Sequence, residues 1–132
     1  MCSIIGYSGN EIAAPIIVKG LKRMEYRGYD SVGVATESEN QIELKKGPGK
    51  VSEVNSKFQL DTLPGKIGIG HTRWATHGSP NELNAHPHAT NQVAIVHNGI
   101  IENYKEIKNI LSNKSLIKSE TDSEAVSYTH LR

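Results

Sequence analysis

The sequence is poor in cysteine, in aromatic residues and in net charge. One cysteine among 132 residues leaves no disulfide within the chain and excludes a zinc site with several cysteine ligands. Aromatic residues make up 5% and the net charge is +1, so neither the basic surface nor the stacking platform that nucleic acids need is expected. No apolar run approaches the roughly 20 residues that span a bilayer, and a signal-peptide pattern is missing. We therefore expect a cytoplasmic protein without nucleic-acid or membrane partners.

Hydrophobic residues make up 36% and charged residues 22% of the chain, proportions typical of one soluble globular domain. Short segments with strand and helix periodicity alternate along it and predict the α+β class, with sheets packed against helices. The expected strands cover residues 2–7, 32–36, 41–46, 66–70 and 93–96, and the expected helices cover residues 13–24, 51–57 and a segment that begins near residue 103.

Two of these segments carry specific expectations. Residues 93–96 form a continuous apolar run, which predicts a strand buried on both faces. Asn103 is expected to cap the last helix, and Tyr104, Ile107 and Leu111 are expected to form its buried side.

The single cysteine lies at position 2, directly after Met1. A thiol attacks a carbonyl as the thiolate, and it needs a base because its unperturbed pKa is about 8.5. If Met1 is removed, the α-amino group of Cys2, with a pKa of about 7.7–8.0, lies beside the sulfur and can serve as that base. The alternative is a small core residue on a buried strand, the commoner role of a lone cysteine.

Other residue types with catalytic uses are concentrated in a few segments. Residues 72–89 show no periodicity, and an irregular stretch of this length inside a domain is usually functional. The segments of interest are Met1-Cys2, residues 25–31 (EYRGYDS), 71–78 (HTRWATHG) with 84–88 (NAHPH), 97–103 (HNGIIEN) and 119–122 (SETD). In this order they resemble the glutaminase domain of the glucosamine-6-phosphate synthase family, the glutamine–fructose-6-phosphate aminotransferases (isomerising). The resemblance runs from residue 1 to about Val126.

This resemblance implies an N-terminal-nucleophile hydrolase fold, an αββα sandwich of two antiparallel sheets between helices, incomplete at its C-terminus. It implies that residues 2–126 are part of a glutaminase domain, that residues 127–132 are a tail foreign to it, and that the sugar isomerase domains are absent. The implied reaction hydrolyses L-glutamine to glutamate and ammonia through a thioester on Cys2, with no metal or organic cofactor. Fructose 6-phosphate is expected to bind only through the missing isomerase domains, and the intact enzyme is expected to be a homo-oligomer.

The resemblance also assigns residues that bind the substrate. Arg73 is expected to hold the α-carboxylate of glutamine with its guanidinium fork, with further contacts from Thr76 and His77 on the same loop. Asp122 is expected to neutralise the α-ammonium group. Each charge has a plainer alternative, a surface salt bridge for Arg73 and a helix N-terminal carboxylate for Asp122.

Further roles follow from the same resemblance. Asn98 and Gly99 are expected to form the oxyanion hole, through a side-chain amide and a backbone N–H, although Asn-Gly is also a strong hairpin-turn signal. Arg27 is expected to support the nucleophile, Trp74 to help gate the passage of ammonia, and His86 to shape the site. A core aromatic is the alternative for Trp74.

Rival interpretations rest on the histidines and on a second family. His86 and His88, with His77 as a third candidate ligand, suggest a metal site, but no second cysteine and no HExxH spacing support it. A non-catalytic module that binds an amino acid or a metal is the corresponding rival. Another cysteine-first enzyme, the phosphoribosyl pyrophosphate amidotransferase of purine synthesis, has a loop that resembles HTRYST where this chain has HTRWAT. One departure from the resembled family is Ser3, where glycine is usual, and its side chain is expected either to crowd the site or to hydrogen-bond in place.

Overall fold

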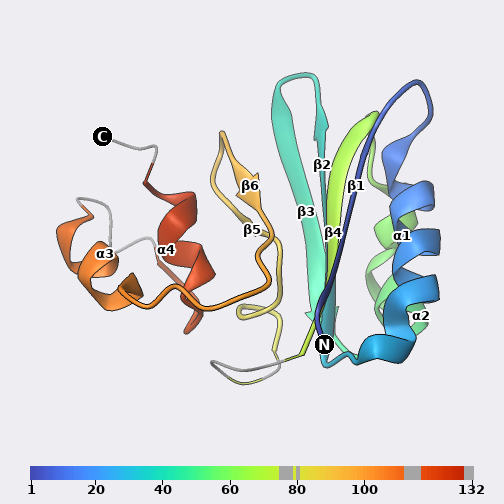
Figure 1. Cartoon of the computed structure of the whole chain (residues 1–132). Helices are drawn as coiled ribbons and strands as arrows, with labels where there is room; N and C mark the ends of the chain where they lie inside the picture. Colours follow the sequence, from blue (N-terminus) through green and yellow to red (C-terminus); the bar gives the residue numbers. More distant parts are fainter. Residues whose placement is uncertain (75–78, 80, 112–116, 130–132) are drawn as a thin grey trace.

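The computed structural model describes residues 1–74, 79, 81–111 and 117–129 of the chain. Figure 1 shows four layers, in which helices α1 and α2 cover one face of a larger sheet, and a small sheet and then helices α3 and α4 follow on its other side. The elements of the first two layers are β1 (Ser3–Ser8), α1 (Ala13–Met24), the 3₁₀ helix η1 (Glu25–Arg27), β2 (Ser31–Ser38), β3 (Gln41–Pro48), α2 (Val51–Phe58), the 3₁₀ helix η2 (Leu60–Thr62) and β4 (Ile67–Arg73). The remaining elements are β5 (His88–Ala89), β6 (Ala94–Ile95), α3 (Tyr104–Ile110) and α4 (Ser123–Ser127).

The larger sheet is antiparallel throughout, with the strand order β1-β4-β2-β3. Its face toward α1 is identified by Gly70, where an added Cβ would overlap the side chain of Ile17. Because side chains alternate along a strand, Thr72 shares that face, whereas His71 and Arg73 point to the opposite face.

Helix α1 confirms the helix predicted over residues 13–24, and its apolar residues form a buried stripe. Ala13, Ile17 and Leu21 have 0% exposure and belong to the core that α1, α2 and the larger sheet share. Ile16 is 36% exposed and lies at the edge of this stripe. Pro15 occupies the first turn of α1, where a missing N–H costs no helical hydrogen bond.

The second half of the chain departs from two expectations. Residues 93–96 are only partly buried, so the prediction of a strand buried on both faces is wrong. The apolar run forms the short strand β6, which pairs with β5 alone among the described strands. Asn103 is the N-cap residue of α3, as predicted, but its side chain makes no capping bond. Helix α3 has no buried residue, and Tyr104, Ile107 and Leu111 are only partly buried, so the prediction of a buried side is wrong. The apolar face of an amphipathic helix is buried only where another element of the fold covers it.

The irregular segment predicted over residues 72–89 is confirmed between β4 and β5 for its described residues. Lys46 holds this segment against β3, because its Nζ donates to the carbonyl oxygens of Ala85 at 2.6 Å and Pro87 at 3.1 Å. Burial lowers the pKa of Lys46 to about 8. Asn84 joins the same segment to Glu120: its Oδ1 accepts from the Glu120 N–H at 2.7 Å, and its Nδ2 donates to Glu120 Oε2 at 3.0 Å. Among the described helices none is long and apolar enough to cross a membrane.

Candidate active site

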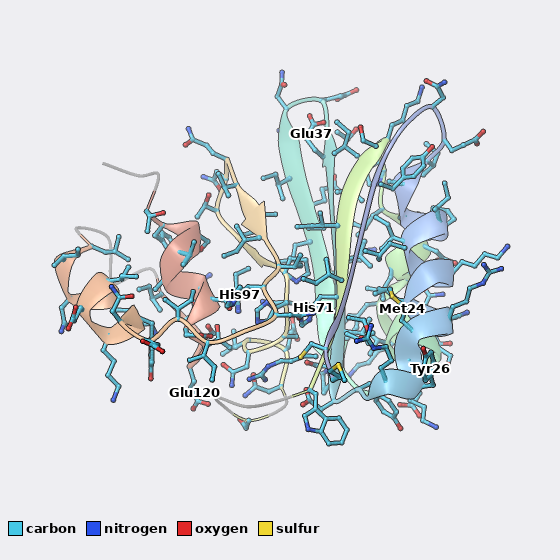
Figure 2. All side chains as sticks on the ribbon, viewed as in Figure 1. Met24, Tyr26, Glu37, His71, His97 and Glu120 are labelled. Carbon is cyan, nitrogen blue, oxygen red and sulfur yellow. The ribbon has the colours of Figure 1, made fainter. Side chains whose placement is uncertain are left out.

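A cavity of about 540 Å³ opens beside the N-terminus, between the larger sheet and the segment that leads into α4. In Figure 2, His71 and His97, two of its lining residues, lie between these parts of the molecule. Eight of the ten predicted site residues line it: Cys2, Arg27, Arg73, Trp74, His86, Asn98, Gly99 and Asp122. The other two, Thr76 and His77, lie outside the described residues.

Cys2 is a free, half-buried thiol at the start of β1. Its Sγ accepts a hydrogen bond from the Trp74 backbone N–H at 3.0 Å. The Met1 ammonium group donates to the carbonyl oxygen of Arg27 at 2.6 Å. Arg27 therefore contacts the nucleophile end mainly through its backbone, and its side-chain Nη2 lies 3.0 Å from the Met1 sulfur.

Ser3 does not crowd Cys2, and its side chain forms no hydrogen bond with any residue that the structure describes. It lies opposite Thr72 in the β1–β4 register, so its side chain points toward the helices while that of Cys2 points toward the cavity. The Ser3 hydroxyl is buried and has no hydrogen-bond partner among the described residues. Both expectations stated for this position are therefore wrong.

Trp74 is 54% exposed and lines the cavity, which excludes the core-aromatic alternative. Its ring lies against Gly28, where an added Cβ would be 2.7 Å from the indole and 2.9 Å from the Met1 nitrogen. Gly28 also has a φ of 120°, a conformation that side chains disfavour. Gly28 thus brings the chain terminus and the indole close together.

Two buried, opposite charges line the cavity. Arg73 is 4% exposed, and its Nη1 donates to the carbonyl oxygen of Ser79 at 3.2 Å. Asp122 is 5% exposed, and its Oδ2 accepts from the Ile101 N–H at 2.6 Å. Arg73 is therefore not a surface residue, and Asp122 makes no side-chain cap bond to α4. A zwitterion with separate carboxylate and ammonium groups suits such a pair.

Asn98 and Gly99 follow β6 and lead toward α3, so they are not a hairpin turn. Gly99 has a φ of 150°, and an added Cβ would be 3.0 Å from Nε2 of His97, so a side chain is strained there. Within the described part of the chain, nothing accepts a hydrogen bond from Asn98 Nδ2 or from the Gly99 N–H. Both donors are available to a ligand oxygen in the cavity.

Three histidines form a cluster behind these donors, in which His71 stacks on His86 and His88 is tilted by 58° to His86. The ring of His71 lies 4.4 Å from that of His86 at an interplanar angle of 19°, and His86 lies 4.6 Å from His88. Burial lowers the pKa of His71 to about 4 and also lowers the pKa values of His86 and His88. No group of three metal-binding side chains occurs among the described residues.

Sequence reasoning missed two residues of this region. His71 donates a hydrogen bond from Nε2 to Asn98 Oδ1 at 2.7 Å, and Thr121 Oγ1 lies 2.7 Å from His88 Nε2. The position of His71 was within reach of the sequence, because a residue two before Arg73 on one strand shares its face. The contact of Thr121 joins residues 33 apart and had no local signal.

Comparisons with known proteins find relatives of this chain, although no family model matches it. Proteins named glutamine–fructose-6-phosphate aminotransferase (isomerizing) are 54% identical in Pyrococcus horikoshii, 56% in Methanococcus maripaludis and 50% in Clostridium acetobutylicum, over 96–97% of this chain. The chain spans about a fifth of the length of these relatives, 21–22%.

Two solved structures share the fold with a TM-score of 0.78 and 28% sequence identity. One is the glutamine phosphoribosylpyrophosphate amidotransferase of B. subtilis in complex with ADP and GMP, matched over 97% of this chain and 28% of the other. The second is described as the allosteric regulatory enzyme of purine biosynthesis, matched over 96% and 28%. The predicted α+β fold of the N-terminal-nucleophile amidotransferases is therefore confirmed.

Proposed function

We propose that this chain, a homologue of the glutamine–fructose-6-phosphate aminotransferases over nearly its whole length, hydrolyses the side-chain amide of L-glutamine with Cys2 as the nucleophile. The observation that carries the proposal is the convergence of a free thiol, two opposite buried charges and two unused N–H donors on one cavity. These are the groups that binding and acyl transfer of an amino-acid amide require.

Glutamine binding is assigned to the charged pair. Arg73 binds the α-carboxylate and Asp122 the α-ammonium group, and Thr76 and His77 add contacts from the loop after β4. With its ends held in this way, the substrate presents its amide to the thiol and to Asn98 and Gly99. Orientation of this kind removes much of the entropic cost of bringing the reacting groups together.

The chemistry begins once Met1 has been removed. The α-amine of Cys2 takes the thiol proton, the sulfur attacks the amide carbon, and the oxyanion receives hydrogen bonds from Asn98 Nδ2 and the Gly99 N–H. Collapse of this intermediate expels ammonia, which takes a proton from the amine, and leaves a γ-glutamyl thioester. Water then attacks the thioester with the amine as base, which releases glutamate and restores the thiol.

The surroundings of Met1 support this processing step. Met1 is 72% exposed and lines the cavity beside Cys2, so its removal enlarges the space at the nucleophile. The Arg27 carbonyl accepts from the Met1 nitrogen, and we assign it the role of orienting the new terminal amine. Trp74 and His86 are assigned the supporting roles of gating ammonia and shaping the cavity.

The acceptor of the ammonia is proposed from the names of the relatives. We propose that the whole protein delivers ammonia to fructose 6-phosphate, gives glucosamine 6-phosphate and works as a homo-oligomer. Relatives with this activity in their names are 50–56% identical to the chain, whereas the phosphoribosylpyrophosphate amidotransferase is 28% identical. The phosphoribosyl acceptor is therefore the weaker candidate.

The first experiment tests the nucleophile. Glutaminase activity and intact mass are measured for the chain and for a chimera in which it replaces the matching region of the Methanococcus maripaludis relative. We expect activity only in molecules that have lost Met1, and a loss of at least about a thousandfold in Cys2→Ala, because the covalent route disappears. Full activity in Cys2→Ala would refute the proposal.

The second experiment tests the carboxylate site by comparing two alkylating reagents on Cys2. A glutamine-like diazo ketone has an α-carboxylate for Arg73, whereas iodoacetamide has none. We expect Arg73→Gln to slow labelling by the diazo ketone at least about tenfold and to leave labelling by iodoacetamide unchanged. Arg23→Gln, an exposed position on α1, is the matched control and should affect neither reagent.

A further inference from the structure

We propose that His71 is a positioning residue that fixes the side-chain amide of Asn98, so that the amide N–H donors face the cavity and the amide oxygen faces away. The inference rests on the proposed function, in which Asn98 stabilises the oxyanion. It assigns a role to a buried side chain that lines the cavity and that the reaction itself does not use.

The direction of the contact follows from its two atoms. Nε2 of His71 lies 2.7 Å from Oδ1 of Asn98, and an amide oxygen can only accept a hydrogen bond. Nε2 therefore has the proton and donates it. The Nδ2 group at the other end of the same amide is then turned away from His71, toward the cavity.

An unheld amide would not keep this orientation. Asn98 is exposed, and rotation of its amide by a half-turn exchanges a donor for an acceptor at nearly the same position. The reversed amide would aim a lone pair at the developing oxyanion, which is repulsive. Among the described residues, His71 is the only side chain with a hydrogen bond to this amide, so the orientation depends on it.

His71 is itself firmly placed. It lies on β4, which pairs with β1 on one side and β2 on the other, opposite Ile4 and Gly33. Its ring is 1% exposed and stacks on His86 at 4.4 Å. Gly33 leaves room for this arrangement, because a Cβ there would overlap the backbone oxygen of His86. The donor is thus held by a central strand and a neighbouring ring.

The His71 ring is also suited to donate a hydrogen bond without transferring its proton. Burial holds the pKa of His71 near 4, so at neutral pH the ring is uncharged and has one N–H, which is engaged with Asn98. The arrangement places a fixed dipole behind the amide without adding a positive charge beside Arg73. No covalent step passes through His71.

Two substitutions separate the donor from the ring. His71→Phe keeps a ring that can stack on His86 and removes the donor, whereas His71→Gln removes the ring and keeps an N–H at the end of a side chain of similar reach. In His71→Phe we expect kcat for glutamine to fall by at least about tenfold. The loss should not exceed the roughly 10²–10³-fold cost of removing an oxyanion-hole donor. KM should change less than about threefold, because Arg73 and Asp122 remain. His71→Gln should recover most of kcat.

A double-mutant cycle with Asn98→Ala tests whether His71 acts through Asn98. In the Asn98→Ala background, His71→Phe should lower kcat by less than about twofold, because no amide remains to be oriented. An equal loss in both backgrounds, or wild-type kcat in His71→Phe, would overturn the inference. These measurements use the 132-residue chain, or the chimera described above if turnover of the chain is too slow to measure.

Two further readouts keep the outcomes distinct. Retained activity in Cys2→Ala would refute the proposed function itself, whereas an inactive Cys2→Ala together with a fully active His71→Phe would refute only the role of His71. If His71→Phe does not fold, ¹⁵N NMR of the wild-type imidazole decides the question. A proton on Nε2 at pH 7 is expected, and a bare Nε2 would overturn the inference.

Discussion

Ser3 is next to Cys2, the proposed nucleophile, but its side chain points to the opposite face of the larger sheet. Its side chain is 2% exposed on the helix-facing side of β1, and its hydroxyl has no partner among the described residues. A buried hydroxyl without a hydrogen bond loses its solvation and receives nothing in return. The residue is thus a local cost to stability and not part of the site.

Substitution of Ser3 should therefore be tolerated. We expect Ser3→Ala to leave the free energy of unfolding unchanged or to raise it by up to about 1 kcal/mol, because the unpaired hydroxyl disappears. Ser31 is the matched control, since it is 0% exposed and its Oγ donates to Asp30 Oδ1 at 3.0 Å. Ser31→Ala should lower the unfolding free energy by about 1 kcal/mol. Urea denaturation measures both, and a larger loss in Ser3→Ala would contradict this account.

At the scale of elements, β2 and β4 position the histidine cluster through close packing. Gly33 on β2 faces His71 across the β2–β4 register, and it approaches the backbone of His86 so closely that a Cβ would overlap it. The segment with His86 is also held by Lys46 from the neighbouring strand β3. Two adjacent strands therefore hold the irregular segment in place, β2 by close packing at Gly33 and β3 by the hydrogen bonds of Lys46.

A methyl group at Gly33 should disturb this packing. We expect Gly33→Ala to lower the unfolding free energy by roughly 1–3 kcal/mol, the usual cost of an overpacked position. We also expect it to displace His86 and, through its ring, His71, which weakens the hydrogen bond between His71 and Asn98. Gly6→Ala is the matched control, because the nearest atom to its added Cβ is 3.8 Å away. Thermal denaturation with glutaminase assays of both variants checks this, and equal effects would count against it.

The elements also differ in how well they are covered. Strand β2 is buried over six consecutive residues from Ser31 to Thr36, whereas α3 has no buried residue and Ile110 in it is 82% exposed. Segments with little burial open locally at low free-energy cost. The difference in burial between the larger sheet and α3 thus predicts two levels of protection of backbone amides from hydrogen exchange.

Hydrogen exchange followed by mass spectrometry should resolve these levels. We expect amides of residues 104–110 to exchange through local opening, at least about tenfold faster relative to their intrinsic rates than amides of residues 31–38, which should need unfolding of the larger sheet. Peptides from α1 serve as a second protected reference. Uniform protection across both halves would contradict the prediction.

At the scale of the whole molecule, the site belongs to neither half alone. Arg73 lies on β4 of the larger sheet and Cys2 directly precedes β1, whereas Asn98 and Asp122 come from the segments around β6 and α4. The halves are joined at the stacked histidines and by the hydrogen bonds of Lys46 and Asn84. Loosening this junction should impair the site before it unfolds the helix-covered sheet.

The junction should also make stability depend on pH. Burial lowers the pKa of His71 to about 4 and lowers those of His86 and His88 as well, whereas in the unfolded chain each is about 6.5. Below pH 6.5 the unfolded state binds protons that the folded state does not, so acid favours unfolding. The stability is fully present above pH 6.5 and is lost as pH falls, toward pH 4 for His71 and further for the other two.

Urea denaturation between pH 7.5 and 5.5 measures this slope above the range in which carboxylates titrate. We expect the unfolding free energy to change little from pH 7.5 to 7 and then to fall, approaching roughly 1 kcal/mol per pH unit for each buried histidine. His88→Gln should reduce the slope by about one histidine's share. A flat profile, or a slope that His88→Gln leaves unchanged, would show that the histidine cluster does not govern the pH response.

Much of this protein was determined by the sequence itself, where the physics is local. The stripe of α1, the hairpin of β2 and β3, and the covalent adjacency of a thiol and a terminal amine at Cys2 depend on residues close together in the chain. Ordered motifs were also enough to indicate the family resemblance and, through it, eight residues that share one cavity.

Only the tertiary structure decided which contacts distant segments make and which of their side chains are buried. It showed that Ser3 faces away from the nucleophile, that the apolar run at 93–96 is only partly covered, and that His71 contacts Asn98. The physical reason is that hydrophobicity and residue type state what a side chain can do, whereas burial and hydrogen bonding depend on which neighbours the fold brings to it. A contact across 27 residues, such as that of His71 with Asn98, has no local pattern from which it could be predicted.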